Sequence, residues 1–154
     1  MPRTLRDDLH QNKPFSSRRE EAMLNVVRTS TSMLDGMEEL LKPHRITSAQ
    51  YNVLRILRGA GPAGLCRNEL RDRLLTRMPD VTRLLDRMEE AGLVSRTRDS
   101  DDRRLVSTRI TEAGRKLVNK LDSHVNDFHR RRLGHLTDKQ LGQLVDLLTL
   151  ARNG

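Results

Sequence analysis

Residues 79–115 read PDVTRLLDRMEEAGLVSRTRDSDDRRLVSTRITEAGR, and three patterns follow one another along this stretch. Apolar side chains first recur every three or four residues, which predicts an amphipathic helix that ends before Gly92. Two runs rich in β-branched residues then occupy 93–98 and 105–110. The polar segment 99–104 joins them, so we expect a β-hairpin with a charged end. The apolar stripe of the predicted helix consists of Val81, Leu84, Leu85 and Met88.

Towards the N-terminus the sequence predicts further helices. A short helix over 66–75 precedes the amphipathic one, which we expect to begin between Thr76 and Pro79, because proline is tolerated in a first helical turn. Thr47 and Gln50 form a capping box that starts another helix.

A long helix comes before these, with a capping box at Ser17 and Glu20 and a stop at Pro43. Residues 1–16 are polar and lack periodicity, and we interpret them as a flexible arm.

Two more helices follow the hairpin. Thr111 caps a long one that reaches about His135, and a third capping box, Thr137 with Gln140, starts the last. The fold class is therefore mainly α with a small β-hairpin. The chain has 154 residues, enough for one domain, and with two Phe, one Tyr and no Trp its core must be largely aliphatic.

The net charge of +8 suggests an anionic partner. Eleven arginines and no lysine lie within 65–110, and arginine suits phosphates and guanine edges. Nine acidic residues share the segment, so a salt-bridged, solvated surface is the alternative.

Two short helices followed by a hairpin form the winged helix-turn-helix pattern, in which the second helix enters the major groove of DNA. With its apolar stripe turned inward, this helix presents an outer face on the opposite side. Arg83 is the candidate for a bidentate guanine contact, and Thr82 for a thymine methyl or a phosphate. Arg67, Arg71 and Arg77 are candidate phosphate contacts. The outer face consists of Pro79, Asp80, Thr82, Arg83, Asp86 and Arg87, together with Arg77 ahead of it.

An alternative is open for the arginines of this face, since Arg83 and Arg87 can pair along the helix with Asp80, Asp86 or Glu90. Phosphates repel Asp80 and Asp86 unless each carboxylate accepts from a cytosine amine or holds an arginine.

The hairpin end carries a second candidate contact. Arg103 or Arg104 can enter the narrow minor groove, and Asp102 is placed to brace the guanidinium. A solvated surface turn is the alternative interpretation.

The runs 79–89, 92–104 and 110–115 resemble the MarR family of bacterial transcription regulators. The family's wing motif falls on Asp102, Arg104, Ile110 and Thr111. The resemblance covers about 18–152 in element order, and 76–115 at the level of motifs.

The resemblance implies a homodimer that binds a pseudo-palindromic operator, and many members of the family are repressors that a small phenolic, lipophilic or anionic ligand releases. It divides the chain into an arm (1–16), a helical dimerisation region (17–46 and 111–154) and a DNA-binding winged lobe (47–110). A winged-helix module that binds protein without sequence-specific DNA recognition is the alternative.

Other classes of function lack a signal. No apolar run approaches the ~20 residues that span a bilayer, and the N-terminus lacks a signal-peptide pattern. One cysteine fits a reducing cytoplasm, so we expect a cytoplasmic protein that associates with the nucleoid when bound to DNA. No enzyme motif and no cofactor motif is found.

Cys66 and the histidines receive structural interpretations. Cys66 is far from the N-terminus, where the peroxide-sensing relatives carry their reactive thiol, and we interpret it as structural. His124 and His129 stand five residues apart without further ligands at metal spacing, so we expect no metal site.

Overall fold

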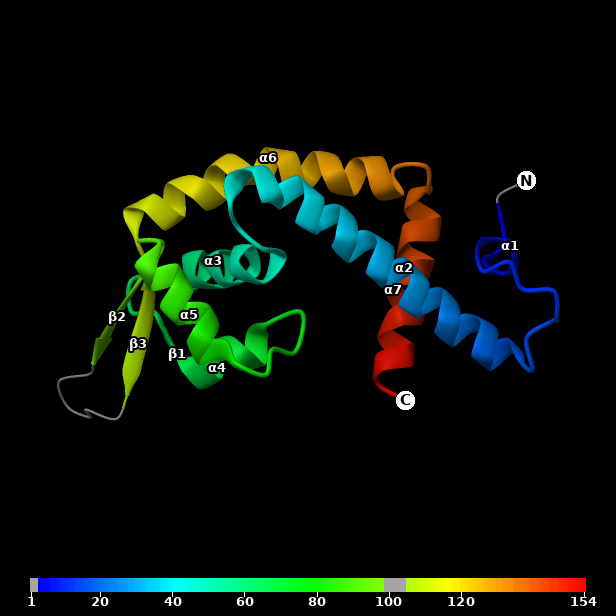
Figure 1. Cartoon of the computed structure of the whole chain (residues 1–154), viewed down its shortest axis with the longest axis horizontal. Helices are drawn as coiled ribbons and strands as arrows, with labels where there is room; N and C mark the ends of the chain where they lie inside the picture. Colours follow the sequence, from blue (N-terminus) through cyan, green and yellow to red (C-terminus); the bar gives the residue numbers. More distant parts are fainter. Residues whose placement is uncertain (1–2, 99–104) are drawn as a thin grey trace.

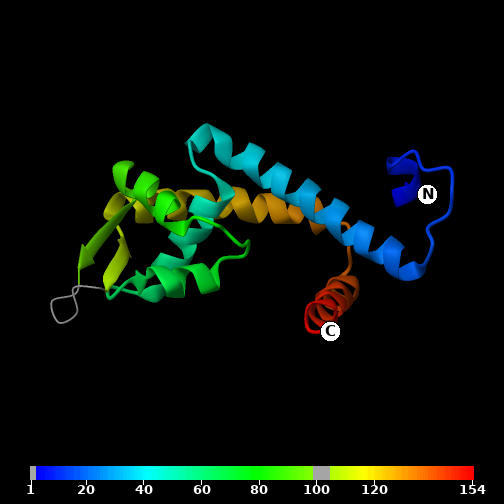
Figure 2. The ribbon, with the colours of Figure 1, turned by 60° about the horizontal axis from the view of Figure 1, so that its bottom comes forward.

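The two longest helices form the frame of the molecule, and a small lobe hangs from one end of it (Figure 1). The computed structural model describes residues 3–98 and 105–154. The frame consists of α2 (Arg18–Leu41) and α6 (Glu112–Leu133), which contact each other. The last helix, α7 (Asp138–Arg152), lies at the end of the frame opposite the sheet in both views (Figures 1 and 2).

The lobe combines three helices with a small sheet. Its helices are α3 (Ser48–Ala60), α4 (Arg67–Arg73) and α5 (Val81–Glu90). Its antiparallel sheet has the order β1-β3-β2, from β1 (Leu65–Cys66), β2 (Val94–Arg98) and β3 (Val106–Ile110). The predicted mainly helical fold with a β-hairpin is thereby confirmed.

The hairpin pairs the two predicted runs, and it gains a strand that the sequence did not predict. β2 and β3 pair from Val94 opposite Ile110 to Arg98 opposite Val106. The extra strand, β1, pairs with β3 through Leu65 opposite Thr108. A two-residue strand is too short to show alternation, so its pairing comes from the tertiary fold.

The predicted caps start most of the helices. Thr47 and Thr137 form complete capping boxes with Gln50 and Gln140, and Thr111 accepts the backbone N–H of Gly114. At α2, Ser17 accepts the N–H of Glu20, but the Glu20 carboxylate accepts from Ser16 instead of closing the box.

The start of α5 corrects the prediction. The helix begins at Val81, and Asp80 is its N-cap, with the Asp80 carboxylate accepting the N–H of Arg83 at 2.9 Å. Pro79 therefore precedes the helix and is not in its first turn. A proline disfavours helical geometry at the residue before it, which opposes an earlier start.

The N-terminal arm contains one helical turn, α1 (Leu5–Asp8), where the sequence pattern indicates no regular structure. Thr4 and Asp7 cap it reciprocally, and Leu5 is buried. This Thr-x-x-Asp pair is the sequence signal that was overlooked.

The core is aliphatic, as expected, and it lies in the lobe, at the end of α2 and along α6 as far as Val125. Its fully buried side chains include Leu54, Leu57, Leu70, Met88 and Leu121. The far end of the molecule is different, because α7 has no buried residue. Exposed apolar side chains there are Met23, Val26 and Val27 of α2 and Val145, Leu147 and Leu150 of α7.

Candidate nucleic-acid interface

The orientation of α5 decides which side chains the lobe can offer to a ligand. Its apolar stripe is buried, with exposed fractions from 0% for Met88 to 8% for Leu84. The remaining side chains must therefore point outward, and Thr82, Arg83 and Arg87 are all exposed. The predicted outer face exists as a surface, although its role stays a prediction.

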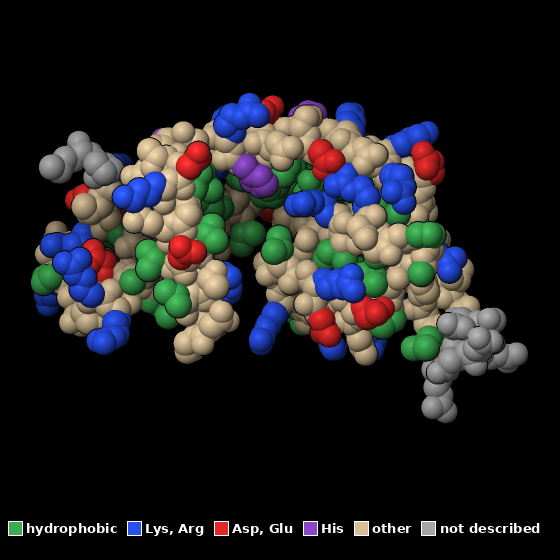
Figure 3. Space-filling view, turned by 180° about the vertical axis from the view of Figure 1, so that it is seen from behind, with side chains coloured by type: hydrophobic (Ala, Val, Ile, Leu, Met, Phe, Trp, Pro, Cys, Tyr) green, Lys and Arg blue, Asp and Glu red, His purple; other side chains and the backbone are tan. Residues whose placement is uncertain are grey.

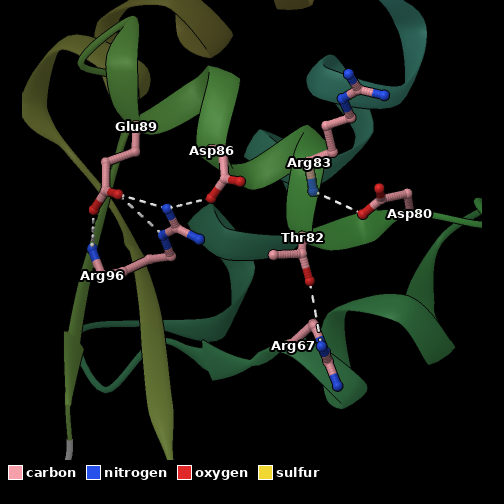
Figure 4. A network of polar contacts seen from close by, with 7 residues as sticks. All are labelled: Arg67, Asp80, Thr82, Arg83, Asp86, Glu89 and Arg96. Atoms are coloured by element: carbon pink, nitrogen blue, oxygen red, sulfur yellow. Dashed lines mark hydrogen bonds and ion pairs between the residues drawn. The ribbon is translucent and has the colours of Figure 1, made fainter.

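Asp80 supports this face from within the protein. Its carboxylate caps the helix by accepting the backbone N–H of Arg83, as Figure 4 shows. A negative group at a helix N-terminus is stabilised by the helix dipole. Among the described residues, no ion pair joins the guanidinium of Arg83 or Arg87 to Asp80, Asp86 or Glu90. The alternative of intrahelical pairing is therefore not the arrangement that the structure shows.

Asp86 has a partner in the neighbouring strand. Its Oδ1 lies 2.6 Å from Nη2 of Arg96, which comes from β2. The same guanidinium binds Glu89, at 2.6 Å from Nη2 and 3.1 Å from Nε to Oε2. Hydrogen bonding by Arg96 lowers the pKa of Glu89 below its ordinary 4.5, which keeps the carboxylate ionised.

Sequence reasoning assigned no role to Arg96. The available signal was the spacing of Asp86 and Glu89, since residues three apart share a helix face. Their partner lies across a turn and could not be read from that spacing. One of the two options stated for Asp86 is nevertheless the observed one, because this carboxylate holds an arginine.

The start of α4 lies beside the start of α5. Arg67 donates from Nη1 to Oγ1 of Thr82 at 3.3 Å, which brings the two helices' exposed ends together (Figure 4). Arg71 is exposed and lies 3.3 Å from Asp72. Arg77 and Pro79 are exposed in the segment between the helices. Among these predicted contacts, the structure thus brings Arg67 of α4 and Thr82 of α5 together.

The predicted wing contacts Asp102, Arg103 and Arg104 lie outside the described residues and stay predictions. The strands beside them are described, and the hairpin pairs as far as Arg98 and Val106.

Cys66 is half-buried and stands at the N-cap of α4. The Glu69 carboxylate accepts the N–H of Cys66 at 2.8 Å, and this bond lowers the pKa of Glu69. A glutamate at the third helical position thus supplies part of the cap that the thiol does not.

Three of the histidines take part in aromatic contacts. The rings of His44 and His124 meet edge to face, with centroids 5.7 Å apart, and His129 lies beside Phe128. Within the described residues no three His, Cys, Asp or Glu side chains are grouped as metal ligands.

Comparison with known proteins identifies the fold. The model of the MarR family matches residues 46–106. A solved MarR transcription factor from Planctomyces limnophilus is 40% identical, with a TM-score of 0.69, and the match covers 89% of this chain and 99% of that one. This chain belongs to the MarR family.

Further relatives connect the MarR fold to transcription. The homoprotocatechuate degradative operon repressor of Escherichia coli is 29% identical over 123 residues, covering 80% of this chain and 82% of the repressor. A mutant of Escherichia coli MarR, solved with operator DNA, is 26% identical with a TM-score of 0.79 and covers 90% of this chain and 99% of that one. These relatives are regulators and not enzymes. As a MarR-family protein, the chain is a DNA-binding transcription regulator.

Among the described residues, no helix of this MarR-family chain combines the length and the apolar character that crossing a membrane requires.

Proposed function

We propose that this MarR-family chain binds a pseudo-palindromic operator as a homodimer and represses transcription from it. One observation carries the proposal: α5 exposes Arg83 and Arg87 beside the hairpin, while its acidic neighbours Asp80 and Asp86 are occupied within the protein. A groove-filling helix with outward-pointing guanidinium groups has the donors that guanine edges and phosphates accept.

In this proposal Arg83 reads a guanine, and Arg87 and Thr82 lie beside it in the major groove. Arg67, Arg71 and Arg77 bind phosphates, and Pro79 borders the same face. Asp80 and Asp86 hold this surface in shape. Arg103 and Arg104 extend the contact into the minor groove, with Asp102 as a brace.

The second copy is proposed to dock on 17–46 and 111–154. Val145, Leu147 and Leu150 of α7 are 61%, 64% and 70% exposed, which is unusual for large apolar side chains on one short helix. A groove of about 820 Å³ runs between α2, the end of α6 and α7, and includes Met33 and Leu144. A two-fold partner would cover these surfaces and place two copies of α5 about one helical turn of DNA apart.

Arg83→Ala tests the reading of sequence. Sites selected from a random DNA pool by the wild-type protein should bind the variant with a loss of about 1–3 kcal/mol, concentrated at particular bases. Binding to unrelated DNA should change little, because Arg83 is proposed to contact a base and not a phosphate. Gel-shift titrations at fixed salt measure both affinities.

Arg55→Ala is the control, since Arg55 is exposed on α3 and lies near Asp122 of α6. Equal losses of specific and non-specific affinity would reduce Arg83 to a phosphate contact. A wild-type protein that selects no sequence would favour the alternative, a winged-helix module for protein partners.

A small phenolic, lipophilic or anionic effector is proposed to release the operator. Figure 3 shows a hollow with hydrophobic side chains between the lobe and the far end of the molecule. The name of the Escherichia coli repressor refers to the degradation of homoprotocatechuate, a phenolic acid. A ligand in the hollow need only favour a spacing of the two lobes that does not fit the operator. A gel-shift screen of aromatic carboxylates tests this step.

The proposed site of action is the cytoplasm, at the nucleoid, because that is where a bacterial operator is found.

A further inference from the structure

Arg96 is held differently from the other arginines of the lobe's DNA-facing surface. It follows Val94 by two residues on β2, so the two side chains leave the strand on the same side. Val94 is buried at 2% exposure, and Arg96 is therefore directed toward α5 and not toward solvent. Its side chain is 22% exposed, whereas Arg83 and Arg87 are exposed residues.

Two carboxylates of α5, Asp86 and Glu89, bind this one guanidinium, and we call these three residues the clamp. Nη2 of Arg96 lies 2.6 Å from both Asp86 and Glu89, and Nε lies 3.1 Å from Glu89. The other oxygen of Glu89 accepts the backbone N–H of Arg96 at 3.1 Å. Figure 4 shows the strand attached to the helix by both its main chain and its side chain. Several contacts in different directions fix an angle, which a single ion pair does not.

The clamp also reduces the negative charge that α5 presents at its surface. Asp86 and Glu89 are 49% and 40% exposed on the helix that carries Arg83, and unpaired carboxylates there would repel phosphates. Bound to Arg96, their charge is partly compensated at a place where the guanidinium itself is largely shielded from solvent.

We propose that Arg96 is a positioning residue for DNA recognition, which sets the angle of the β2–β3 hairpin, the wing, to α5, the recognition helix, so that both engage adjacent grooves at once. The inference rests on the proposed function and adds that contacts from α5 fix the orientation of the wing. An arginine that only stabilised the fold would leave the pattern of DNA contacts intact in any variant that folds.

The test compares Arg96→Gln with Arg58→Gln. Arg58 is a matched control because it also binds a carboxylate through two nitrogens, Asp122 at 2.7 and 3.1 Å, and its side chain is 25% exposed, but it joins α3 to α6. The probe is a labelled duplex that carries the site selected by the wild-type protein. We expect Arg96→Gln to weaken binding about tenfold, the equivalent of one good contact, and Arg58→Gln to bind nearly as the wild type does.

The DNA footprint provides a readout that a change in protein stability alone would not alter. At saturating protein, hydroxyl-radical protection of the minor groove at the outer flanks should be lost in Arg96→Gln. Protection of guanine N7 from methylation in the major groove should remain. Arg96→Lys should restore part of the flank protection, because an ammonium can still reach one carboxylate. Unchanged flank protection in Arg96→Gln, or the same change in Arg58→Gln, would overturn the proposal.

Asp86→Asn removes the more exposed of the two carboxylates that bind Arg96 and keeps the test valid should Arg96→Gln fold poorly. We expect a smaller loss of flank protection, and full protection would contradict the inference. Amide exchange without DNA gives an independent measure: β2 and β3 should exchange faster in Arg96→Gln than in Arg58→Gln. If the wild-type protein selects no operator, the proposed function fails, whereas equal exchange in both variants counts against the clamp alone.

Discussion

The guanidinium of Arg58 joins the lobe to the frame at the scale of single residues. It donates to Asp122 and Asn119 of α6 from its place on α3. Hydrogen bonding by Arg58 is the main cause that lowers the pKa of Asp122 below its ordinary 3.8. Because folding lowers this pKa, the pair stabilises the folded state above pH 3.8, and the contribution is lost as the pH falls through the lowered value.

Asp122→Asn should therefore destabilise the protein near neutral pH and lose this effect in acid. The side chain of Asp122 is 40% exposed, so solvent screening limits the expected cost to about 1 kcal/mol. Urea unfolding at one protein concentration, at about pH 7 and about pH 3, measures the difference. Asp127→Asn is the control, because its pair with Arg130 is more exposed and should contribute little. A cost that is equal at both pH values would contradict the assignment.

At the residue scale, the sequence predicts a side chain's hydrogen bond correctly where the partner lies a few residues away along the chain. Thr47, Thr111 and Thr137 cap as expected, because the N–H groups they accept lie three residues away. The exposure of Arg83 followed from helical periodicity. The partner of Arg96 did not, because it depends on how a strand packs against a helix.

At the scale of elements, α6 begins in close contact with the turn that ends α5. The N–H of Thr111 donates to the carbonyl of Leu93 at 3.1 Å, and the hydroxyl donates to the carbonyl of Gly92. A Cβ at Gly114 would overlap the carbonyl oxygen of Leu93. Glycine at this position thus lets the first turn of α6 approach the backbone that leads into β2.

Gly114→Ala should consequently destabilise the lobe by about 1–3 kcal/mol, because the clash is with backbone and cannot be relieved by a side-chain rotation. Gly59→Ala is the matched control: Gly59 lies in α3, and outside the helix's own backbone no atom comes within 4 Å of the place that a Cβ would take. Alanine there should add about 0.5–1 kcal/mol of stability. Thermal unfolding of both variants at equal concentration gives the comparison. A neutral Gly114→Ala would mean that α6 shifts freely against the turn.

The elements also show the limit of prediction from pattern. Helices with several turns were placed within a few residues, because their apolar stripes repeat. The start of α5 was misplaced, since both Pro79 and Asp80 are start signals and the carboxylate that reaches the N–H of Arg83 decides between them. β1 was missed because two residues show no period.

At the scale of the whole molecule, the distribution of apolar surface divides the chain. The lobe buries its stripes against α6, whereas α7 buries no residue and leaves Val145, Leu147 and Leu150 exposed. A single copy therefore has a complete core at one end and an incomplete one at the other, which is the arrangement expected of a subunit whose partner completes the second. The sequence indicates the same, because its long flanking helices carry more apolar side chains than a compact lobe can bury.

Leu147→Glu should dissociate the proposed dimer while leaving the lobe folded, because Leu147 is 64% exposed and contributes little to the core of its own chain. Arg55→Glu is the control: it places a carboxylate on α3, outside 17–46 and 111–154, and should leave the dimer intact. Sedimentation measures the mass of each variant, and helical content checks the fold. Operator affinity should fall steeply in Leu147→Glu alone, because two linked half-sites bind far more tightly than two separate ones. A monomer that retained wild-type affinity would show that the lobes do not act as a pair, and a dimer that survived the charge would place the interface elsewhere than on α7.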